Sequence, residues 1–247
     1  MIIIDGGSTD NTIDMIKKYE KYISYWVSEN DRGQSHALNK GFKQATGDIF
    51  GWLNSDDLYY PNSFYIVIEY FKKYLRKDII IGDYLTVDTN DENAKLIYAL
   101  DFNINHFIYE GSICNAQSCF WRKKVHDKFG LFDKKLEKTM DYDMLVRFGI
   151  NEGNRKFVYT KRVMGCFRRH KNQKSLGVFD KIVLDEQKLI SKKNNLIIRH
   201  SIEAKFYRLL YRCRRILWYL KLGGIEYILL KLYYKYKSIS HQHIADF

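Results

Sequence analysis

The chain is poor in the features that mark several protein classes. Of its 247 residues only one is proline, and no internal repeat or low-complexity tract is present. Because 46% of the residues are hydrophobic and 16% aromatic, the chain can bury a sizeable core, which excludes an intrinsically disordered protein. No apolar run reaches the roughly 18 residues that a membrane-spanning helix needs. The sequence therefore predicts a globular protein without a transmembrane helix.

Cysteine is also scarce. The four cysteines, Cys114, Cys119, Cys166 and Cys213, lack the close spacing of metal-ligand pairs, which argues against a zinc module. No secretory signal peptide is recognisable at the N-terminus. We therefore expect reduced thiols and a cytoplasmic protein.

The most informative segment is 48–57, Asp-Ile-Phe-Gly-Trp-Leu-Asn-Ser-Asp-Asp. Its hydrophobic run predicts a buried strand, and it ends in Asp56 and Asp57, where twisted α/β sheets place their ligands. Adjacent carboxylates repel each other, so the pair favours a divalent cation, and oxygen ligands favour Mg²⁺ or Mn²⁺ over zinc. A solvated turn is the alternative interpretation, because Asn, Ser and Asp are also turn formers.

The residues before this segment alternate between strand and helix patterns. Three isoleucines and a Gly-Gly turn precede Ser8, Thr9 and Asp10, each a suitable helix cap. Asp5 ends the first strand beside a loop whose free backbone N–H groups suit a nucleotide. The expected elements are a strand at 2–4, a helix at 11–21, a strand at 23–28 and a helix at 34–45. This order predicts an α/β fold with right-handed crossovers.

Several short motifs occur in a fixed order. They are Asp5-Gly-Gly-Ser-Thr-Asp10, Asp31-Arg-Gly33, Ala37-Leu-Asn-Lys-Gly41, Ala45-Thr-Gly-Asp48, Leu53-Asn-Ser-Asp-Asp57 and, later, Thr139-Met-Asp-Tyr-Asp-Met-Leu-Val-Arg147. Together they resemble the signatures of the family 2 inverting glycosyltransferases. The resemblance implies a GT-A (Rossmann-like) fold with a mixed, mainly parallel sheet flanked by helices. It also implies a nucleotide-sugar donor and transfer to a hydroxyl with inversion at the anomeric carbon.

The resemblance further implies roles for individual residues. Asp56 corresponds to the metal-binding acid of the family's Asp-x-Asp motif, with Asp57 assisting directly or through water, and Mn²⁺ or Mg²⁺ would neutralise the diphosphate leaving group. The first position of that motif is Asn54, a departure that removes one charge. The expected nucleotide-sugar contacts are Asp5, Ser8, Asp31, Asn39, Asn54 and His170. His170 belongs to a basic segment, 167–170, that would close over the diphosphate, although a lone histidine more often has no such role.

The same resemblance assigns the general base to Asp141. Inversion needs one base that accepts the acceptor's proton opposite the leaving group. Met140 stands where the family usually has Glu, so the motif is only partly intact. Asp141 and Asp143 also fit a purely structural role, as acids at the N-terminus of a helix at about 142–151.

The remaining segments predict scaffold. Pro61 precedes a helix at 62–74, and hydrophobic runs predict strands at 78–83, 95–100 and 116–121. Trp121, at the end of the last, is expected in the core rather than stacked on a sugar. The resemblance begins at what would be the family's second strand, so we expect a gap in the sheet and an unpaired edge. Whether such a chain binds its donor is left open.

The charge is concentrated at the C-terminus. Residues 192–247 hold 12 Lys or Arg and 3 Asp or Glu, a net charge of +9 out of the chain's +12, which predicts a catalytic domain at 1–190 and a basic helical tail at 191–247. A helix at 204–221 would end at Gly223-Gly224, with helix resuming at 225–237. One side holds Phe206, Leu209, Leu210, Cys213, Leu217 and Leu220, and the other holds Lys205, Arg208, Arg212 and Arg215. Such a helix is typical of an anionic membrane surface; the alternative is that its apolar side packs on the catalytic domain.

These patterns predict an enzyme at the inner face of a bacterial plasma membrane. It would transfer a sugar, with a UDP-sugar as the expected donor, to a glycan or lipid-linked acceptor of a surface polysaccharide. One alternative is a non-catalytic remnant or scaffold with an incomplete donor site. A nucleic-acid binder is the other, but the sequence shows no recognisable nucleic-acid module.

Overall fold

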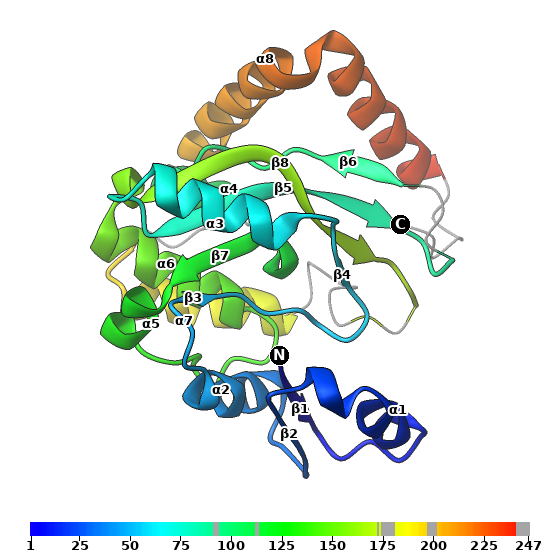
Figure 1. Ribbon diagram of the computed structural model, residues 1–247. Helices are drawn as coiled ribbons and strands as arrows, with labels where there is room; N and C mark the ends of the chain where they lie inside the picture. The colour runs from blue at the N-terminus through cyan, green and yellow to red at the C-terminus, as the bar shows by residue number, and fades with distance from the viewer. Residues whose placement is uncertain (91–93, 112–113, 172, 174–180, 197–201, 241–247) are drawn as a thin grey trace.

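The computed structural model describes residues 1–90, 94–111, 114–171, 173, 181–196 and 202–240 (Figure 1). The strands are β1 (Ile2–Asp5), β2 (Tyr25–Ser28), β3 (Ile49–Phe50), β4 (Leu58–Tyr59), β5 (Ile79–Val87), β6 (Lys95–Ile97), β7 (Cys119–Arg122) and β8 (Phe157–Arg168). The helices are α1 (Thr12–Lys18), α2 (Gln34–Gln44), α3 (Ser63–Lys73), α4 (Ile104–Glu110), α5 (Lys123–Phe129), α6 (Met140–Glu152), α7 (Lys181–Lys193) and α8 (Ile202–Ser240). Short 3₁₀ turns lie at Glu20–Tyr22, Ala116–Ser118 and Asn154–Lys156.

The larger sheet is mixed, as expected. Its hydrogen-bonded order is β3-β7-β5-β8-β4, and β6 pairs with β5. Only the long β5–β8 ladder is parallel in this sheet, and the other ladders are antiparallel. The predicted predominance of parallel ladders is therefore wrong for the described strands. Helices cover the sheet, so the α/β class with flanking helices is confirmed (Figure 1).

Strands β1 and β2 form a separate parallel pair. Among the described strands no ladder joins this pair to the larger sheet, in line with the expected gap. Helix α2 connects the two parts instead. Gly41 packs against the Ile4 side chain, where an added Cβ would lie 3.3 Å from Ile4 Cγ1, while Leu38 and Phe42 pack on the main core.

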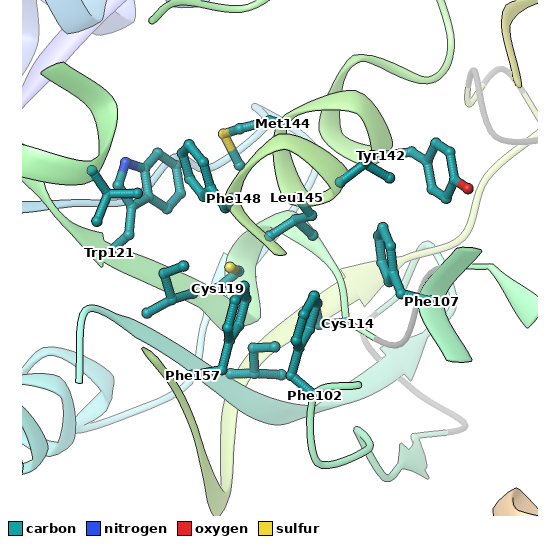
Figure 2. Close-up of a cluster of buried hydrophobic side chains, with 14 of the residues drawn as sticks. Phe102, Phe107, Cys114, Cys119, Trp121, Tyr142, Met144, Leu145, Phe148 and Phe157 are labelled. Atoms are coloured by element: carbon teal, nitrogen blue, oxygen red, sulfur yellow. The ribbon is translucent and has the colours of Figure 1, made fainter. Parts of the chain in front are cut away.

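The main core lies between the large sheet and helices α4 and α6 (Figure 2). Ile79 and Ile81 of β5 are fully buried, as is Trp121, so the core interpretation of Trp121 is confirmed. The rings of Phe102 and Phe157 stack with centroids 3.5 Å apart. Fully burying one such side chain contributes about 2 to 3 kcal/mol.

The acidic segment forms less strand than predicted. Only Ile49 and Phe50 pair, with Arg122 and Trp121 of β7. The chain beyond them is still held by packing, because Trp52 is buried and stands edge-on to Trp121 and Phe132. The buried run before Asp56 is therefore real, although side-chain packing fixes it rather than a ladder.

Helix α8 consists of two helical arms that meet at a sharp bend at Gly224, whose φ is 66°, where the predicted Gly-Gly break lies. Arg212 and Arg215 form ion pairs with Glu110 of α4. No helix in the described part of the chain is both long and apolar enough to cross a membrane. The predicted 190/191 boundary falls inside α7, and the division into two domains stays a prediction.

Candidate active site

The acidic loop between β3 and β4 is fixed from inside the protein. Asp57 is 4% exposed, and its carboxylate accepts hydrogen bonds from the Arg168 backbone N–H (3.0 Å) and the Asn54 amide (3.4 Å). Burial raises the pKa of Asp57 to about 6, and the charge of Asp56 adds to this. Because both carboxylate oxygens are used within the protein, Asp57 fits a supporting role better than direct coordination of a metal.

Asp56 points the other way, toward the end of β8. Its Oδ2 lies 2.8 Å from His170 Nε2, and both side chains are partly exposed, at 38% and 28%. Arg168 Nη1 donates to the Asp56 carbonyl oxygen at 3.2 Å. The fold thus brings together two predicted ligand-binding residues that are far apart in the sequence.

This pair fits a divalent cation that takes its other ligands from a substrate. Within the described residues no group of three or more His, Cys, Asp and Glu side chains gathers as a metal site. Mg²⁺ is commonly held by one or two protein carboxylates together with phosphate oxygens and water, and Mn²⁺ favours similar oxygen ligands. Asp56, with His170 beside it, therefore suits a metal that arrives with a diphosphate.

The first turn of α2 joins this loop to a second part of the site. Gln34 Nε2 donates to Asn54 Oδ1 at 2.6 Å. The next residue, Ser35, is buried, and its hydroxyl lies 2.9 Å from Met140 Sδ and 3.1 Å from the Leu136 carbonyl oxygen. Two adjacent residues of one helix therefore contact the acidic loop and the residue that precedes Asp141.

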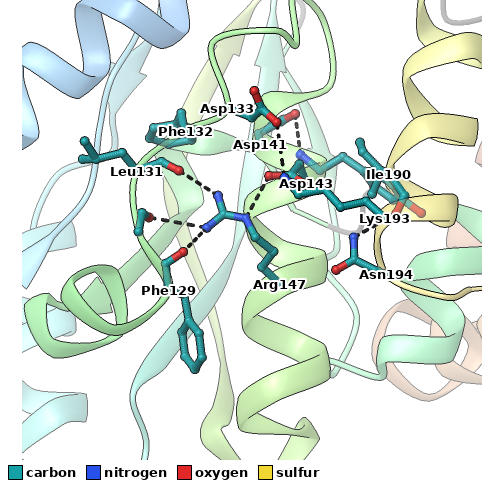
Figure 3. Close-up of polar contacts among 12 residues, drawn as sticks. Phe129, Leu131, Phe132, Asp133, Asp141, Asp143, Arg147, Ile190, Lys193 and Asn194 are labelled. Atoms are coloured by element: carbon teal, nitrogen blue, oxygen red, sulfur yellow. Dashed lines mark hydrogen bonds and ion pairs between the residues drawn. The ribbon is translucent and has the colours of Figure 1, made fainter.

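Asp141 lies in the first turn of α6 and is half-buried. One carboxylate oxygen accepts a hydrogen bond from the Tyr142 backbone N–H at 2.7 Å. Burial raises the pKa of Asp141, and the negative charge of Glu186 adds to this. A carboxylate with a raised pKa is a better proton acceptor, which suits a general base. Asp143, by contrast, is completely buried and paired with Arg147 at 2.8 Å (Figure 3), so its structural interpretation is confirmed.

Glu186 of α7 holds the turn that leads into Asp141. Its carboxylate accepts hydrogen bonds from the backbone N–H groups of Glu137 (2.6 Å), Lys138 (3.1 Å) and Thr139 (2.9 Å), and from the Thr139 hydroxyl (2.8 Å). These are charge-assisted bonds of the stronger kind. The start of α6 is therefore set from outside the helix.

Asn39 does not fit its predicted contact with the donor. It is 2% exposed, and its amide donates to the Phe132 carbonyl oxygen and accepts from the Phe132 N–H, both at 2.9 Å. Arg147 likewise donates to carbonyl oxygens of residues 129–131 (Figure 3). We correct the role of Asn39 to fixing the backbone at Phe132, because both ends of its amide are used there.

The predicted nucleotide loop is held by its own acid. The Asp5 carboxylate accepts hydrogen bonds from Gly7 N (3.0 Å), Ser8 N (2.9 Å), Ser8 Oγ (2.5 Å) and Ser28 Oγ (2.6 Å). Burial alone would raise the pKa of Asp5, but these hydrogen bonds outweigh it and lower the pKa to about 2. Asp5 therefore ties the β1 loop to the end of β2, and its contact with a nucleotide stays a prediction.

Asp31 lies directly beside that loop. A Cβ added at Gly6 would lie 2.7 Å from Asp31 Oδ2, so a side chain at this position would displace the Asp31 carboxylate. Asp31 Oδ1 also accepts from the Gly33 N–H at 2.7 Å, just before α2 begins. The first two loops of the chain thus meet, and Asp31 leads directly to the helix that bears Gln34.

Sequence reasoning missed three residues of this arrangement: Gln34, Ser35 and Glu186. It placed Arg168, within the basic segment 167–170, over the diphosphate, whereas here Arg168 contacts the acidic loop. Gln34 and Ser35 follow Asp31-Arg-Gly33 directly, and polar residues in a helix's first turn near a predicted site were an available signal. Glu186 carried no such signal, because its partners are backbone groups 47 to 49 positions earlier in the chain.

Known proteins share sequence with this chain. The model of glycosyl transferase family 2 matches residues 1–130. An uncharacterized glycosyltransferase of Rickettsia typhi is 31% identical over 157 residues, which are 60% of this chain and 48% of the relative. A PGL/p-HBAD biosynthesis glycosyltransferase of Mycobacterium tuberculosis is 26% identical over 153 residues, 60% of this chain and 57% of the relative. The chain spans about half the length of these relatives.

Solved structures share the fold. Staphylococcus aureus TarS 1–349 in complex with UDP-GlcNAc superposes with a TM-score of 0.64 at 13% identity, over 90% of this chain and 65% of the other. The Pyrobaculum calidifontis mannosyltransferase PcManGT, with GDP-Man and Mn²⁺, gives a TM-score of 0.53 at 11% identity, over 96% of this chain and 70% of the other. The motifs, the GT-A fold and the match to more than half of the sequence lead to one conclusion: this chain belongs to glycosyl transferase family 2.

Proposed function

We propose that the protein transfers a sugar from a nucleotide-diphosphate donor to a hydroxyl group, with inversion at the anomeric carbon. The observation that carries the proposal is the first turn of α2, where Gln34 contacts Asn54 of the acidic loop and Ser35 contacts Met140 beside Asp141. A transferase of this kind needs a diphosphate-binding group and a base held at a fixed separation. Helix α2, a single rigid element, would hold these two groups at that separation.

Donor binding would involve both loops that follow the small sheet. Ser8 and Asp31 come from the two loops that meet at Gly6 and are the residues we assign to the nucleoside, with Asp5 holding the loop of Ser8. UDP is the expected nucleotide, because the neighbouring TarS structure binds UDP-GlcNAc. PcManGT binds GDP-Man, which makes GDP the main competitor to test.

Mn²⁺ or Mg²⁺ would be held by Asp56 with His170 and would neutralise the charge that develops on the departing diphosphate. Asn54 and Asp57 would keep the acidic loop in place through the bonds to Gln34 and Arg168. The Mn²⁺ in the PcManGT structure supports this assignment by analogy.

Asp141 would act as the general base. As the acceptor oxygen attacks the anomeric carbon, its proton passes to the Asp141 carboxylate. The bond from that carbon to the diphosphate oxygen breaks, and the nucleoside diphosphate leaves with the electron pair. The raised pKa of Asp141 suits this role, and the Glu186 contacts would keep its helix oriented.

The acceptor we propose is a glycan or lipid-linked saccharide of a bacterial surface polysaccharide, used at the cytoplasmic face of the plasma membrane. Two features support it: the bacterial relatives and the basic residues of 192–247. A non-catalytic scaffold with an incomplete donor site is the competing reading, motivated by the separation of the β1–β2 pair from the main sheet.

Thermal unfolding in the presence of nucleotides distinguishes the active transferase from the non-catalytic scaffold. UDP, GDP, dTDP and CDP are compared with and without Mn²⁺, since a ligand that binds only the folded state raises the melting temperature. We expect a shift that needs Mn²⁺ with one nucleotide and disappears in Asp56→Ala. Asp48→Ala, which changes an exposed acid at the start of the same segment, is the matched control. No shift with any nucleotide would favour the scaffold.

A further inference from the structure

Helix α8 docks on the domain through its aromatic side. Trp218 Nε1 donates to the Ala99 carbonyl oxygen at 3.1 Å, and the Tyr211 ring stacks on Tyr109. Beyond the bend at Gly224, the Tyr227 ring packs against Tyr98 with centroids 4.5 Å apart. Both arms of the bent helix therefore contact the domain along their inner side, and together they form an arch over it (Figure 1).

The opposite side of α8 is aliphatic and exposed. In the first arm the exposed side chains are Phe206 (67%), Leu209 (62%), Leu210 (48%), Ile216 (48%), Leu217 (64%) and Leu220 (41%). At 3.6 residues per turn they fall on one arc, opposite the fully buried Ala204. In the second arm Ile225, Leu229 and Leu232 are more than half exposed, opposite Tyr227. We call these nine residues, of which all but Phe206 are aliphatic, the aliphatic face.

This arrangement contradicts the alternative of the sequence analysis, in which the aliphatic side packs on the catalytic domain. That contact is made by the aromatic side, and the aliphatic face lies outward. Contiguous exposed apolar surface on this scale commonly marks a protein or membrane contact.

In the first arm, exposed cations border the aliphatic face on both margins. On the helical projection Lys205 lies on one margin, and Arg214 and Lys221 lie on the other. When an apolar strip inserts into the boundary between lipid headgroups and acyl chains, the cations beside it lie at the depth of the headgroups. They also disfavour a second copy as the occupant, since pairing two such faces brings like charges together.

We infer that the aliphatic face of α8 inserts into the interface of an anionic bilayer. This inference makes the membrane location given under the proposed function more specific. It rests on the proposed function only for the identity of the acceptor. Because the aromatic side stays docked on Ala99 and Tyr98, the domain would be held at a fixed orientation to the lipid surface rather than tethered by a free tail.

Co-sedimentation of the full chain with vesicles tests the proposal. Vesicles of phosphatidylcholine alone are compared with vesicles that contain phosphatidylglycerol. We expect binding that requires the anionic lipid and weakens at least about tenfold in a Phe206→Ser/Leu209→Ser/Leu217→Ser variant. Lys205→Glu/Arg214→Glu/Lys221→Glu should weaken it to a similar degree.

The matched control removes an equal number of exposed apolar side chains elsewhere. Phe64→Ser/Tyr65→Ser/Ile68→Ser changes the outer face of α3, where exposures are 59%, 66% and 44%, and should leave vesicle binding unchanged. Equal losses in the α3 and α8 variants would overturn the proposal. So would a native dimer, measured by light scattering, that the α8 variant abolishes while neither protein binds vesicles.

A label in the middle of the aliphatic face reports insertion directly. Cys213 is exposed, whereas Cys114 and Cys119 are buried and Cys166 is half-buried. A polarity-sensitive fluorophore on Cys213 in a Cys166→Ser background should shift to the blue on anionic vesicles and be quenched by lipid-borne nitroxides. An unchanged spectrum on vesicles that do bind the protein would overturn insertion by this face. Nucleotide binding in solution is measured separately, so failure of the membrane proposal is distinguishable from failure of the proposed activity.

Discussion

Gln34 Nε2 donates a hydrogen bond of 2.6 Å to Asn54 Oδ1. This contact links the first turn of α2 to the acidic loop, while the neighbouring Ser35 contacts Met140 at the start of α6. The predicted diphosphate-binding and proton-accepting groups therefore rest on one helix. A change at Gln34 or Ser35 should therefore affect the site without altering a group that is assigned to contact the substrate.

Replacing Gln34 by Leu should weaken metal-dependent nucleotide binding about tenfold. The substitution removes one partly buried hydrogen bond, worth about 1 to 1.5 kcal/mol, and frees the Asn54 side chain, so the acidic loop loses a fixed orientation. Isothermal titration with the nucleotide and Mn²⁺ measures the change. Gln44→Leu, an exposed residue at the far end of the same helix, is the control, and an equal loss there would show that the effect is not local.

Replacing Asp141 by Asn should abolish sugar transfer and leave nucleotide affinity unchanged. The amide keeps the size of the side chain, but it cannot accept the acceptor's proton, so the loss should appear in kcat. Turnover measured beside nucleotide titration separates the two effects. Turnover equal to that of the native protein would remove Asp141 from the mechanism and leave it as a helix N-terminal acid.

Much of the fold was readable from the sequence because its signals are local. The Ile2–Asp5 strand and helix α2 follow from hydrophobic patterns, and the Gly-Gly break of the last helix recurs as the bend at Gly224. Strand pairing was less predictable. Which strands become neighbours depends on long-range packing. No local sequence signal identifies β7 as the antiparallel neighbour of β5.

The site was predicted in part for the same reason. The pairing of Asp56 with His170 joins residues 114 positions apart, and only the family resemblance indicated it. Asn39 was misassigned because its motif resembles a ligand-binding segment, whereas its amide is used on Phe132. For α8 the sequence predicted the apolar side but left open whether that side faces a membrane or packs on the domain. A helical pattern identifies two sides, but it does not say which one docks when the docked side is built from tyrosine and tryptophan.

Replacing Glu186 by Gln should lower the free energy of unfolding by about 2 kcal/mol and reduce turnover. One carboxylate oxygen becomes an NH₂ group that faces backbone donors, so at least one buried N–H of residues 137–139 loses its acceptor. Chemical denaturation measures the stability. Asp185→Asn, an exposed acid on the same helix paired with Lys188, should change it by less than about 0.5 kcal/mol. If both variants lost the same free energy of unfolding, the hydrogen bonds of Glu186 would contribute no more to stability than an exposed charge does.

Replacing His126 by Phe should make the protein less sensitive to acid. His126 is 4% exposed among Phe42, Phe50, Trp121 and Phe132, and within the described residues neither ring nitrogen has a hydrogen-bond partner. Burial lowers the pKa of His126 to about 4, and the charge of Arg147 adds to this. The neutral ring is therefore the form that the core accepts.

The sign of the effect follows from proton uptake. Between pH 6.5 and about 4 the unfolded chain binds a proton at this histidine and the folded chain does not, so stability is lost as the pH falls through this range. The slope is about 1.4 kcal/mol per pH unit for one group. His106, whose pKa burial also lowers to about 4, contributes equally in both proteins and cancels in the comparison. Urea unfolding of both proteins at several pH values in this range should show that the free energy of unfolding falls less steeply with decreasing pH in the variant. Equal slopes for the two proteins would mean that His126 takes up its proton in the folded state.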